Sequence, residues 1–168
     1  MARAALDELA LDKLLWMPTG RPGYYREPPV ASAEHRVNML HLALEGEPRY
    51  EIDARELSPA VTGYTADTLR ELRLELGADA ELFLLLGADQ YEKLGSWHRP
   101  ADVKRLAKLA VFARPGYAVP SGDARVIAMP PMPVAGVDIR ARAAHREDLS
   151  SLVPPAVARY IADHGLYQ

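Results

Sequence analysis

The sequence contains no cysteine, which excludes disulfide bonds, thiolate metal sites and a thiol nucleophile. It also has no hydrophobic run long enough to cross a membrane, and its N-terminus lacks the apolar core of a signal peptide. A chain without cysteine suits a reducing compartment. We therefore expect a protein of the cytoplasm that has no contact with a membrane.

Excess charge of either sign is missing as well. The 168 residues carry a net charge of −3, which provides no positive field to attract nucleic acid. The composition, 49% hydrophobic and 26% charged, is that of an ordinary globular protein. This length suits a single domain over residues 1–168 with one core.

Several common functional motifs do not occur. There is no G-x-x-x-x-G-K-[ST] phosphate loop, no G-x-G-x-x-G dinucleotide motif, no G-x-S-x-G nucleophile elbow and no H-E-x-x-H zinc helix. His35 and His41 lie six residues apart on one expected helix, so they do not share a face and do not suit a metal. We expect no resident metal ligands.

The most informative stretch that is present runs from Glu81 to Arg99. Leu82–Leu86 is apolar without alternation, which predicts a strand buried on both faces, as in a parallel sheet. Asp89 follows directly, and Trp97 and His98 come shortly afterwards. Because ligands bind at the carboxyl ends of strands in open α/β sheets, these residues are candidates for a ligand site.

Strand-like and helix-like segments alternate along the chain, which predicts a three-layer α/β fold with parallel strands. Ser32 is the expected N-cap of one helix and Thr65 that of the next. The expected strands are 14–17, 50–57, 82–86, 109–113 and 125–129, and the expected helices are 1–10, 33–44, 66–77, 100–107, 138–144 and 154–164.

Two features allow two interpretations each. Thr65, Asp67 and Thr68 begin a helix, where they could cap it or bind an anion, and capping is favoured about two to one. The loop 19–29 carries Arg21, Tyr24, Tyr25 and Arg26, which suit phosphate or ring contacts as well as a solvated surface loop.

Several segments together resemble the bacterial nicotinate-nucleotide adenylyltransferases. They are ordered and spaced as in that family and cover nearly the whole chain: ASAEHR (31–36), GYTADTLRELR (63–73), GADQYEKLGSWHR (87–99), ARPGY (113–117), DIRAR (138–142) and LVPPAVARYIADHGLY (152–167).

The resemblance implies a Rossmann-like nucleotidyltransferase fold that transfers AMP from ATP to nicotinate mononucleotide, with Mg²⁺, giving deamido-NAD and pyrophosphate in NAD biosynthesis. By it, Asp89 contacts a nucleotide ribose, Trp97 stacks on the pyridine ring beside His98, Thr68 holds the nicotinate end and Arg140 meets ATP phosphates. Trp97 could instead be a core aromatic, and Arg140 part of a surface salt bridge.

Two departures from the family concern the ATP side. The family's first strand and its G-G-T-F-D-P-x-H-x-G-H motif do not occur, so no catalytic histidine pair can be named. We accordingly expect Met1 to be an internal start and the neighbours of that strand to have unpaired edges. The family's [IV]-S-[SA]-[ST]-x-I-R motif reads VAGVDIR over Val134–Arg140, without hydroxyls.

We therefore expect AMP transfer by this chain to be impaired. A non-catalytic relative that binds a nicotinate nucleotide, or that regulates an active enzyme, is the first alternative, and an inert fragment is the second.

Overall fold

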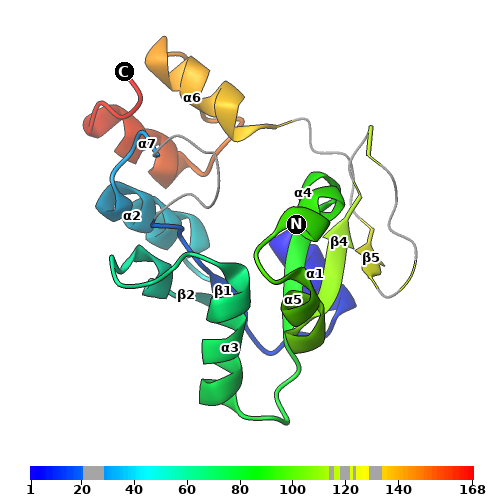
Figure 1. Cartoon of the computed structure of the whole chain (residues 1–168). Coiled ribbons are helices and arrows are strands. Elements are labelled where there is room, and N and C mark those ends of the chain that lie inside the picture. The colour runs from blue at the N-terminus through cyan, green and yellow to red at the C-terminus, as the bar shows by residue number, and fades with distance from the viewer. Residues whose placement is uncertain (21–28, 114–115, 118–121, 123, 129–133) are drawn as a thin grey trace. The chain divides into compact units, whose positions relative to one another are not determined.

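The computed structural model describes residues 1–20, 29–113, 116–117, 122, 124–128 and 134–168 (Figure 1). The expected contacts of Arg21, Tyr24, Tyr25 and Arg26 lie outside these residues. The chain divides into two compact units: a first unit of Met1–Leu14 with Thr62–Pro131, and a second unit of Leu15–Val61 with Met132–Gln168.

The first unit contains a sheet of three parallel strands, in the order β3, β4, β5. Their bounds are Phe83–Gly87 for β3, Lys108–Phe112 for β4 and Arg125–Ile127 for β5. In the register, Leu85 lies beside Ala110 and Ala110 beside Arg125. The parallel strands predicted from the sequence are therefore confirmed.

Helices cover both faces of this sheet. On one face α3 (Thr65–Leu76) and α5 (Pro100–Leu106) pack on Leu84, Leu86 and Leu109. On the other face α1 (Ala2–Glu8) packs with Ala110, Phe112 and Ile127. The first unit thus has the expected three layers, helix, sheet and helix.

Strand β3 has apolar contacts on both faces, as the sequence predicts, but less burial than expected. Leu86 is its one buried residue, and Phe83, Leu84 and Leu85 are half-buried. Four residues of β4, Leu109 to Phe112, are buried. The difference arises because β4 has a partner on each side, whereas among the described strands β3 pairs with β4 alone.

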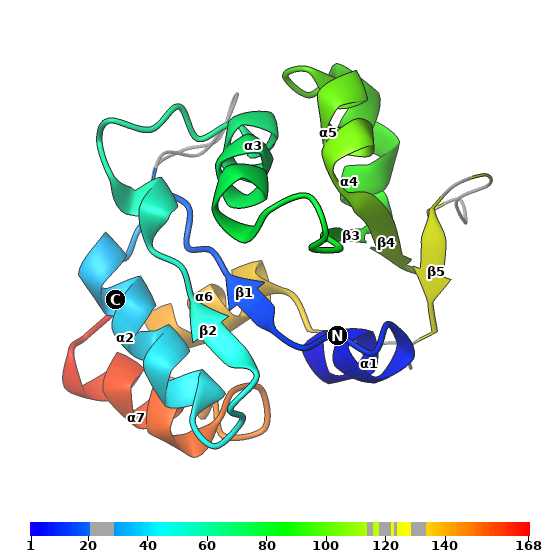
Figure 2. The same cartoon turned by 90° about the horizontal axis from the view of Figure 1, so that it is seen from below.

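The second unit contains helices α2 (Ala33–Leu44), α6 (Gly136–Ala144) and α7 (Pro155–Asp163). It also contains β2 (Tyr50–Ile52) and all but the first residue of β1 (Leu14–Trp16), which together form a two-stranded sheet. Its core contains Ala143, Leu149, Val157, Ile161 and Leu166. Figure 2 shows α2 and α7 side by side. The Asn38 Nδ2 atom of α2 donates a 2.9 Å hydrogen bond to the Tyr160 hydroxyl of α7, so this helix pair has a polar link as well as apolar contacts.

The ends of α2 and α3 agree with the sequence expectations only in part. Ser32 does cap α2, since its Oγ accepts a hydrogen bond from the His35 N–H at 3.2 Å. Thr65 does not cap α3: it is already the first helical residue, and Tyr64 is the N-cap. The spacing of Leu69, Leu72 and Leu76 predicts that all three face inward, but Leu76 is 53% exposed because Gly77, at φ 83°, ends the helix immediately after it.

The strand expected over 50–57 ends early, at Ile52. The Asp53 carboxylate accepts hydrogen bonds from the Arg55 N–H at 3.0 Å and from Arg55 Nε at 2.7 Å. These bonds turn the chain into the short 3₁₀ helix η1 (Arg55–Leu57). In the described part of the chain, no helix is both long and apolar enough to span a membrane.

Candidate functional site

Four of the five predicted site residues lie in the first unit: Thr68, Asp89, Trp97 and His98. They come from three places, namely the first turn of α3, the first turn of α4 (Ala88–Lys93) and the segment between η2 (Leu94–Ser96) and α5. Arg140 lies in the second unit.

Asp89 follows the carboxyl end of β3 with almost no connecting loop. The strand ends at Gly87, which is also the N-cap of α4, and Asp89 lies in the first helical turn. Its Oδ2 accepts a hydrogen bond from Gln90 Nε2 at 3.1 Å. A Cβ atom on Gly87 would lie 2.6 Å from Asp89 Oδ1, so the carboxylate bends back over the end of the strand and would have to turn aside for a larger residue there.

Trp97 lies at the edge of the first unit's core. It is half-buried and packs against the cluster that includes Leu94 and Val103, as a core aromatic would. The remainder of its side chain is exposed, and its role as a ring platform stays a prediction.

His98 is exposed and stacks on Tyr64, with ring centroids 4.1 Å apart and planes at 23°. Tyr64 was not among the predicted site residues. The available signal was an aromatic residue directly before the helix N-terminus in the segment GYTADTL. This stacked pair brings the start of α3 together with the segment before α5.

Thr68 is only 8% exposed, and its hydroxyl donates to the Tyr64 carbonyl oxygen at 3.5 Å. Such a bond to the preceding turn is a common local arrangement of threonine in helices. The group that organises the α3 N-terminus is instead Thr62, whose Oγ1 accepts from the Tyr64 N–H at 3.2 Å and donates to Asp67 Oδ2 at 2.8 Å.

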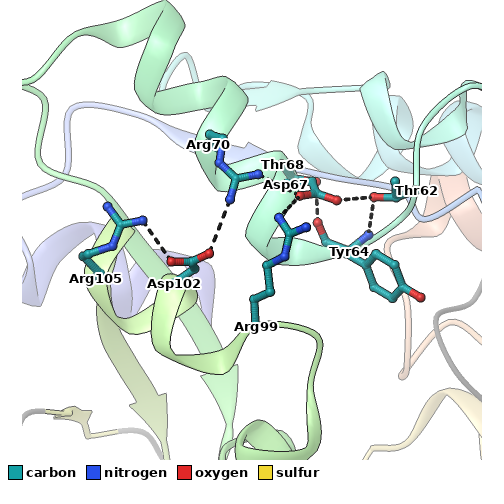
Figure 3. A network of polar contacts seen from close by, with 8 residues as sticks. All are labelled: Thr62, Tyr64, Asp67, Thr68, Arg70, Arg99, Asp102 and Arg105. Carbon is teal, nitrogen blue, oxygen red and sulfur yellow. Dashed lines mark hydrogen bonds and ion pairs between the residues drawn. The ribbon is translucent and has the colours of Figure 1, made fainter.

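A chain of charges extends from Asp67 (Figure 3). Asp67 Oδ1 accepts hydrogen bonds from Arg70 at 2.9 Å and from Arg99 at 3.3 Å. Asp102 continues the chain, since it pairs with Arg70 at 3.3 Å and with Arg105 at 2.9 Å. The hydrogen bond from Thr62, followed by those from the arginines, holds the pKa of Asp67 below its usual value and overcomes the opposing effect of burial.

Arg140 is exposed on α6, in the second unit. Its Nη1 atom would lie 3.1 Å from a Cβ on Gly136, so the guanidinium folds back over the first turn of the helix. Its charge opposes the effect of burial, which raises the pKa of the Tyr167 hydroxyl. No carboxylate among the described residues forms an ion pair with Arg140.

No three His, Asp or Glu side chains gather into a metal-binding group within the described ranges. The donor groups seen there do not fit a resident metal ion.

Comparison of the sequence with known proteins shows the family of this chain. Residues 1–152 match the model of the cytidylyltransferase-like family. A probable nicotinate-nucleotide adenylyltransferase of Chromobacterium violaceum is 41% identical over 191 aligned positions, which cover 100% of this chain and 90% of the relative. A protein of the same description from Laribacter hongkongensis is 38% identical, with coverage of 100% and 86%.

A solved structure supports the same fold. The Plasmodium falciparum nicotinic acid mononucleotide adenylyltransferase complexed with NaAD aligns with a TM-score of 0.76 at 16% identity, over 99% of this chain and 89% of that one. The resemblance seen in the sequence motifs and the expected Rossmann-like α/β fold are therefore both confirmed. The chain belongs to the cytidylyltransferase-like family of nucleotidyltransferases and, within it, to the nicotinate-nucleotide adenylyltransferases.

Proposed function

We propose that this chain transfers the AMP group of ATP to nicotinate mononucleotide, giving deamido-NAD and pyrophosphate, as a step of NAD biosynthesis in the cytoplasm. The observation that carries the proposal is full-length identity of 41% to a relative of that description. The stacking of His98 on Tyr64 supports it, because this contact joins two segments that carry the predicted nicotinate-binding residues.

In the proposed reaction, a phosphate oxygen of nicotinate mononucleotide attacks the α-phosphorus of ATP. A new P–O bond forms, and the bond to the β-phosphate bridging oxygen breaks, so the electron pair and the negative charge leave with pyrophosphate. No covalent intermediate with the protein is required. The contribution of the chain is to orient the two nucleotides and to stabilise charge on phosphate.

On the nicotinate side we assign three tasks. The accessible part of Trp97 stacks on the pyridine ring, with His98 beside it. Thr68 helps to hold the nicotinate end, and the Asp89 carboxylate accepts a hydrogen bond from a ribose hydroxyl.

On the ATP side, Arg140 binds phosphate oxygens. Mg²⁺ belongs to the ATP substrate in this proposal, and no step is assigned to a protein-bound metal.

We propose that transfer is slow. The segment Val134–Arg140 contains no serine or threonine to donate hydrogen bonds to ATP phosphates. Loss of one such donor commonly lowers kcat by about 10²–10³. The same hydroxyl-free segment favours the second candidate function, a non-catalytic protein that binds nicotinate mononucleotide or regulates an active relative.

Pyrophosphate release with ATP and nicotinate mononucleotide together is the decisive measurement. Calorimetry with each nucleotide alone separates the alternatives. Slow turnover with binding of both nucleotides supports the proposal, and binding of nicotinate mononucleotide without turnover supports the non-catalytic candidate. If neither nucleotide binds and the thermal melt is non-cooperative, both candidates fail.

A further inference from the structure

Asp67 connects three segments around the predicted nicotinate-binding residues. Its Oδ2 accepts from Thr62 in the loop before α3, and its Oδ1 accepts from Arg70 within α3 and from Arg99 at the start of α5 (Figure 3).

The bond to Arg99 bears on Trp97 and His98, which directly precede it. Arg99 has a left-handed backbone (φ 51°, ψ 58°), a conformation that is strained for a residue with a side chain and persists only where its surroundings hold it. Its carbonyl oxygen accepts from the N–H groups of Asp102 and Val103 at 3.0 and 3.2 Å, so Arg99 also begins α5. Fixing the Arg99 side chain therefore helps to fix the turn that presents both aromatic rings.

The bond to Thr62 bears on Tyr64. The Thr62 hydroxyl accepts from the Tyr64 N–H while it donates to Asp67, so the bond to Asp67 helps to hold the Thr62 oxygen beside Tyr64. Asp67 thus acts on both rings of the stacked pair, on Tyr64 through Thr62 and on His98 through Arg99.

We propose that Asp67 is a positioning residue for nicotinate mononucleotide, which keeps the turn of Trp97 and His98 aligned with the first turn of α3. The inference rests on the proposed function. Asp67 itself does not touch the substrate in this proposal. Its effect is to preorganise the surfaces that do.

Electrostatics alone predicts the opposite effect of removing the Asp67 charge on the affinity for nicotinate mononucleotide. Nicotinate mononucleotide carries a carboxylate and a phosphate, both negative. Removing the charge of Asp67 would reduce repulsion and release the Arg99 guanidinium, and so would tighten binding. If Asp67 positions the rings, its loss weakens binding instead, because the rings no longer start from the bound arrangement.

Asp102 provides a matched control. Its carboxylate is the same chemical group and binds the same Arg70, but its other partner is Arg105, and it makes no hydrogen bond to the Arg99 guanidinium or to Thr62. Arg99 and Arg105 form a second matched pair of variants. Among the described residues the Arg105 guanidinium binds Asp102, whereas the Arg99 guanidinium binds Asp67.

The test is calorimetry of the full chain with nicotinate mononucleotide, without ATP. We expect Asp67→Asn and Arg99→Gln each to raise the Kd about tenfold. Asp102→Asn and Arg105→Gln should change it less than about twofold, as expected of exposed ion pairs. Affinity for ATP alone should be the same in all four variants, which a general loss of folding could not produce.

An unchanged or lower Kd for both Asp67→Asn and Arg99→Gln overturns the inference while leaving the proposed function intact. An equal effect of Asp102→Asn also overturns it, because Arg70 or general charge would then be responsible. If the unaltered protein does not bind nicotinate mononucleotide, the proposed function and the inference fail together. If Asp67→Asn does not fold, Arg99→Gln, which keeps the carboxylate, decides the question.

Discussion

At the scale of single residues, Gly87 leaves room for the Asp89 carboxylate. A Cβ atom at position 87 would lie 2.6 Å from Asp89 Oδ1, closer than Cβ atoms in real structures approach a neighbour. We expect Gly87→Ala to turn this carboxylate away from the strand end. If Asp89 contacts the ribose, the Kd for nicotinate mononucleotide should then rise about tenfold, which corresponds to a loss of about 1.4 kcal/mol of binding free energy.

Gly95→Ala is the matched control, since nothing lies within 4 Å of a Cβ at that position. It should leave both affinity and melting temperature within error. Calorimetry and a thermal melt of the two variants suffice. Equal affinity of Gly87→Ala and the unaltered protein would remove Asp89 from the binding site.

The ionisation of Asp67 gives a prediction about stability. Its pKa lies below the ordinary 3.8, so folding favours the charged form. Asp67 therefore contributes stability that is complete well above pH 3.8 and is lost as the pH falls through its lower folded pKa. The melting temperature of the unaltered protein should exceed that of Asp67→Asn by a constant margin at neutral pH, and the margin should shrink only below pH 3.8.

Comparing the two proteins is essential, because Asp102 and Asp148 also have lowered pKa values and titrate in both. Their contribution cancels in the difference between the curves. A margin that disappears already between pH 7 and 5 would show that another group controls it.

At this scale the sequence indicated candidate residues, but it did not indicate which distant residues contact each other. Trp97, His98 and Asp89 stood out by their type and their place after a strand. Tyr64 and the pairing of Asp67 with Arg99 did not, because the two members of each contact lie more than 30 residues apart in the chain. No local pattern encodes which distant arginine a helix-terminal aspartate meets.

At the scale of elements, prediction succeeded where short-range physics decides. Ser32 caps α2, and Gly77 ends α3, through bonds and backbone angles within a few residues. It failed where two local signals compete. Thr65 is a good capping residue, but the Thr62 hydroxyl already makes hydrogen bonds with the Tyr64 N–H and with Asp67. Strand β2 ends early because Asp53 binds Arg55.

The contact between α2 and α7 gives a prediction about an element pair. The Tyr160 hydroxyl accepts a hydrogen bond from Asn38 Nδ2 and also lies 2.9 Å from His35 Nδ1. Tyr160→Phe leaves these half-buried groups without that partner and should lower the free energy of unfolding by about 1 kcal/mol. The measurement is the urea midpoint.

Tyr91→Phe serves as its control. Tyr91 is also half-buried and packs on a core cluster, but its hydroxyl forms no hydrogen bond with any described residue. The two variants remove the same atom from similar surroundings. Equal midpoints for both would mean that the polar link between the helices contributes nothing.

At the scale of the whole molecule, the alternation of segments predicted the layers of the first unit but not the division into two units. Each unit combines two stretches that are distant in the chain, and no local sequence pattern shows which distant stretches pack together. The division has a consequence for the proposed function. Thr68, Asp89, Trp97 and His98 belong to the first unit, whereas Arg140 belongs to the second.

A ligand that binds one unit should stabilise that unit more than the other. At 100 times its Kd, a ligand adds about 2.7 kcal/mol to the part that it binds. We expect nicotinate mononucleotide to slow amide hydrogen exchange in α3, α4 and the turn before α5, with a smaller effect in α2 and α7. Mass spectrometry of peptic fragments resolves these segments.

The same exchange measurement on Asp67→Asn tests whether Asp67 holds the turn before α5. At equal ligand occupancy the substitution should reduce protection in the turn that ends at Arg99 more than in α4, because only that turn loses its anchor on α3. Protection that falls uniformly over the first unit would point to a general loss of stability instead. Protection concentrated in α2 and α7 would place the nicotinate nucleotide on the second unit, contrary to the assignment of Trp97 as its ring platform.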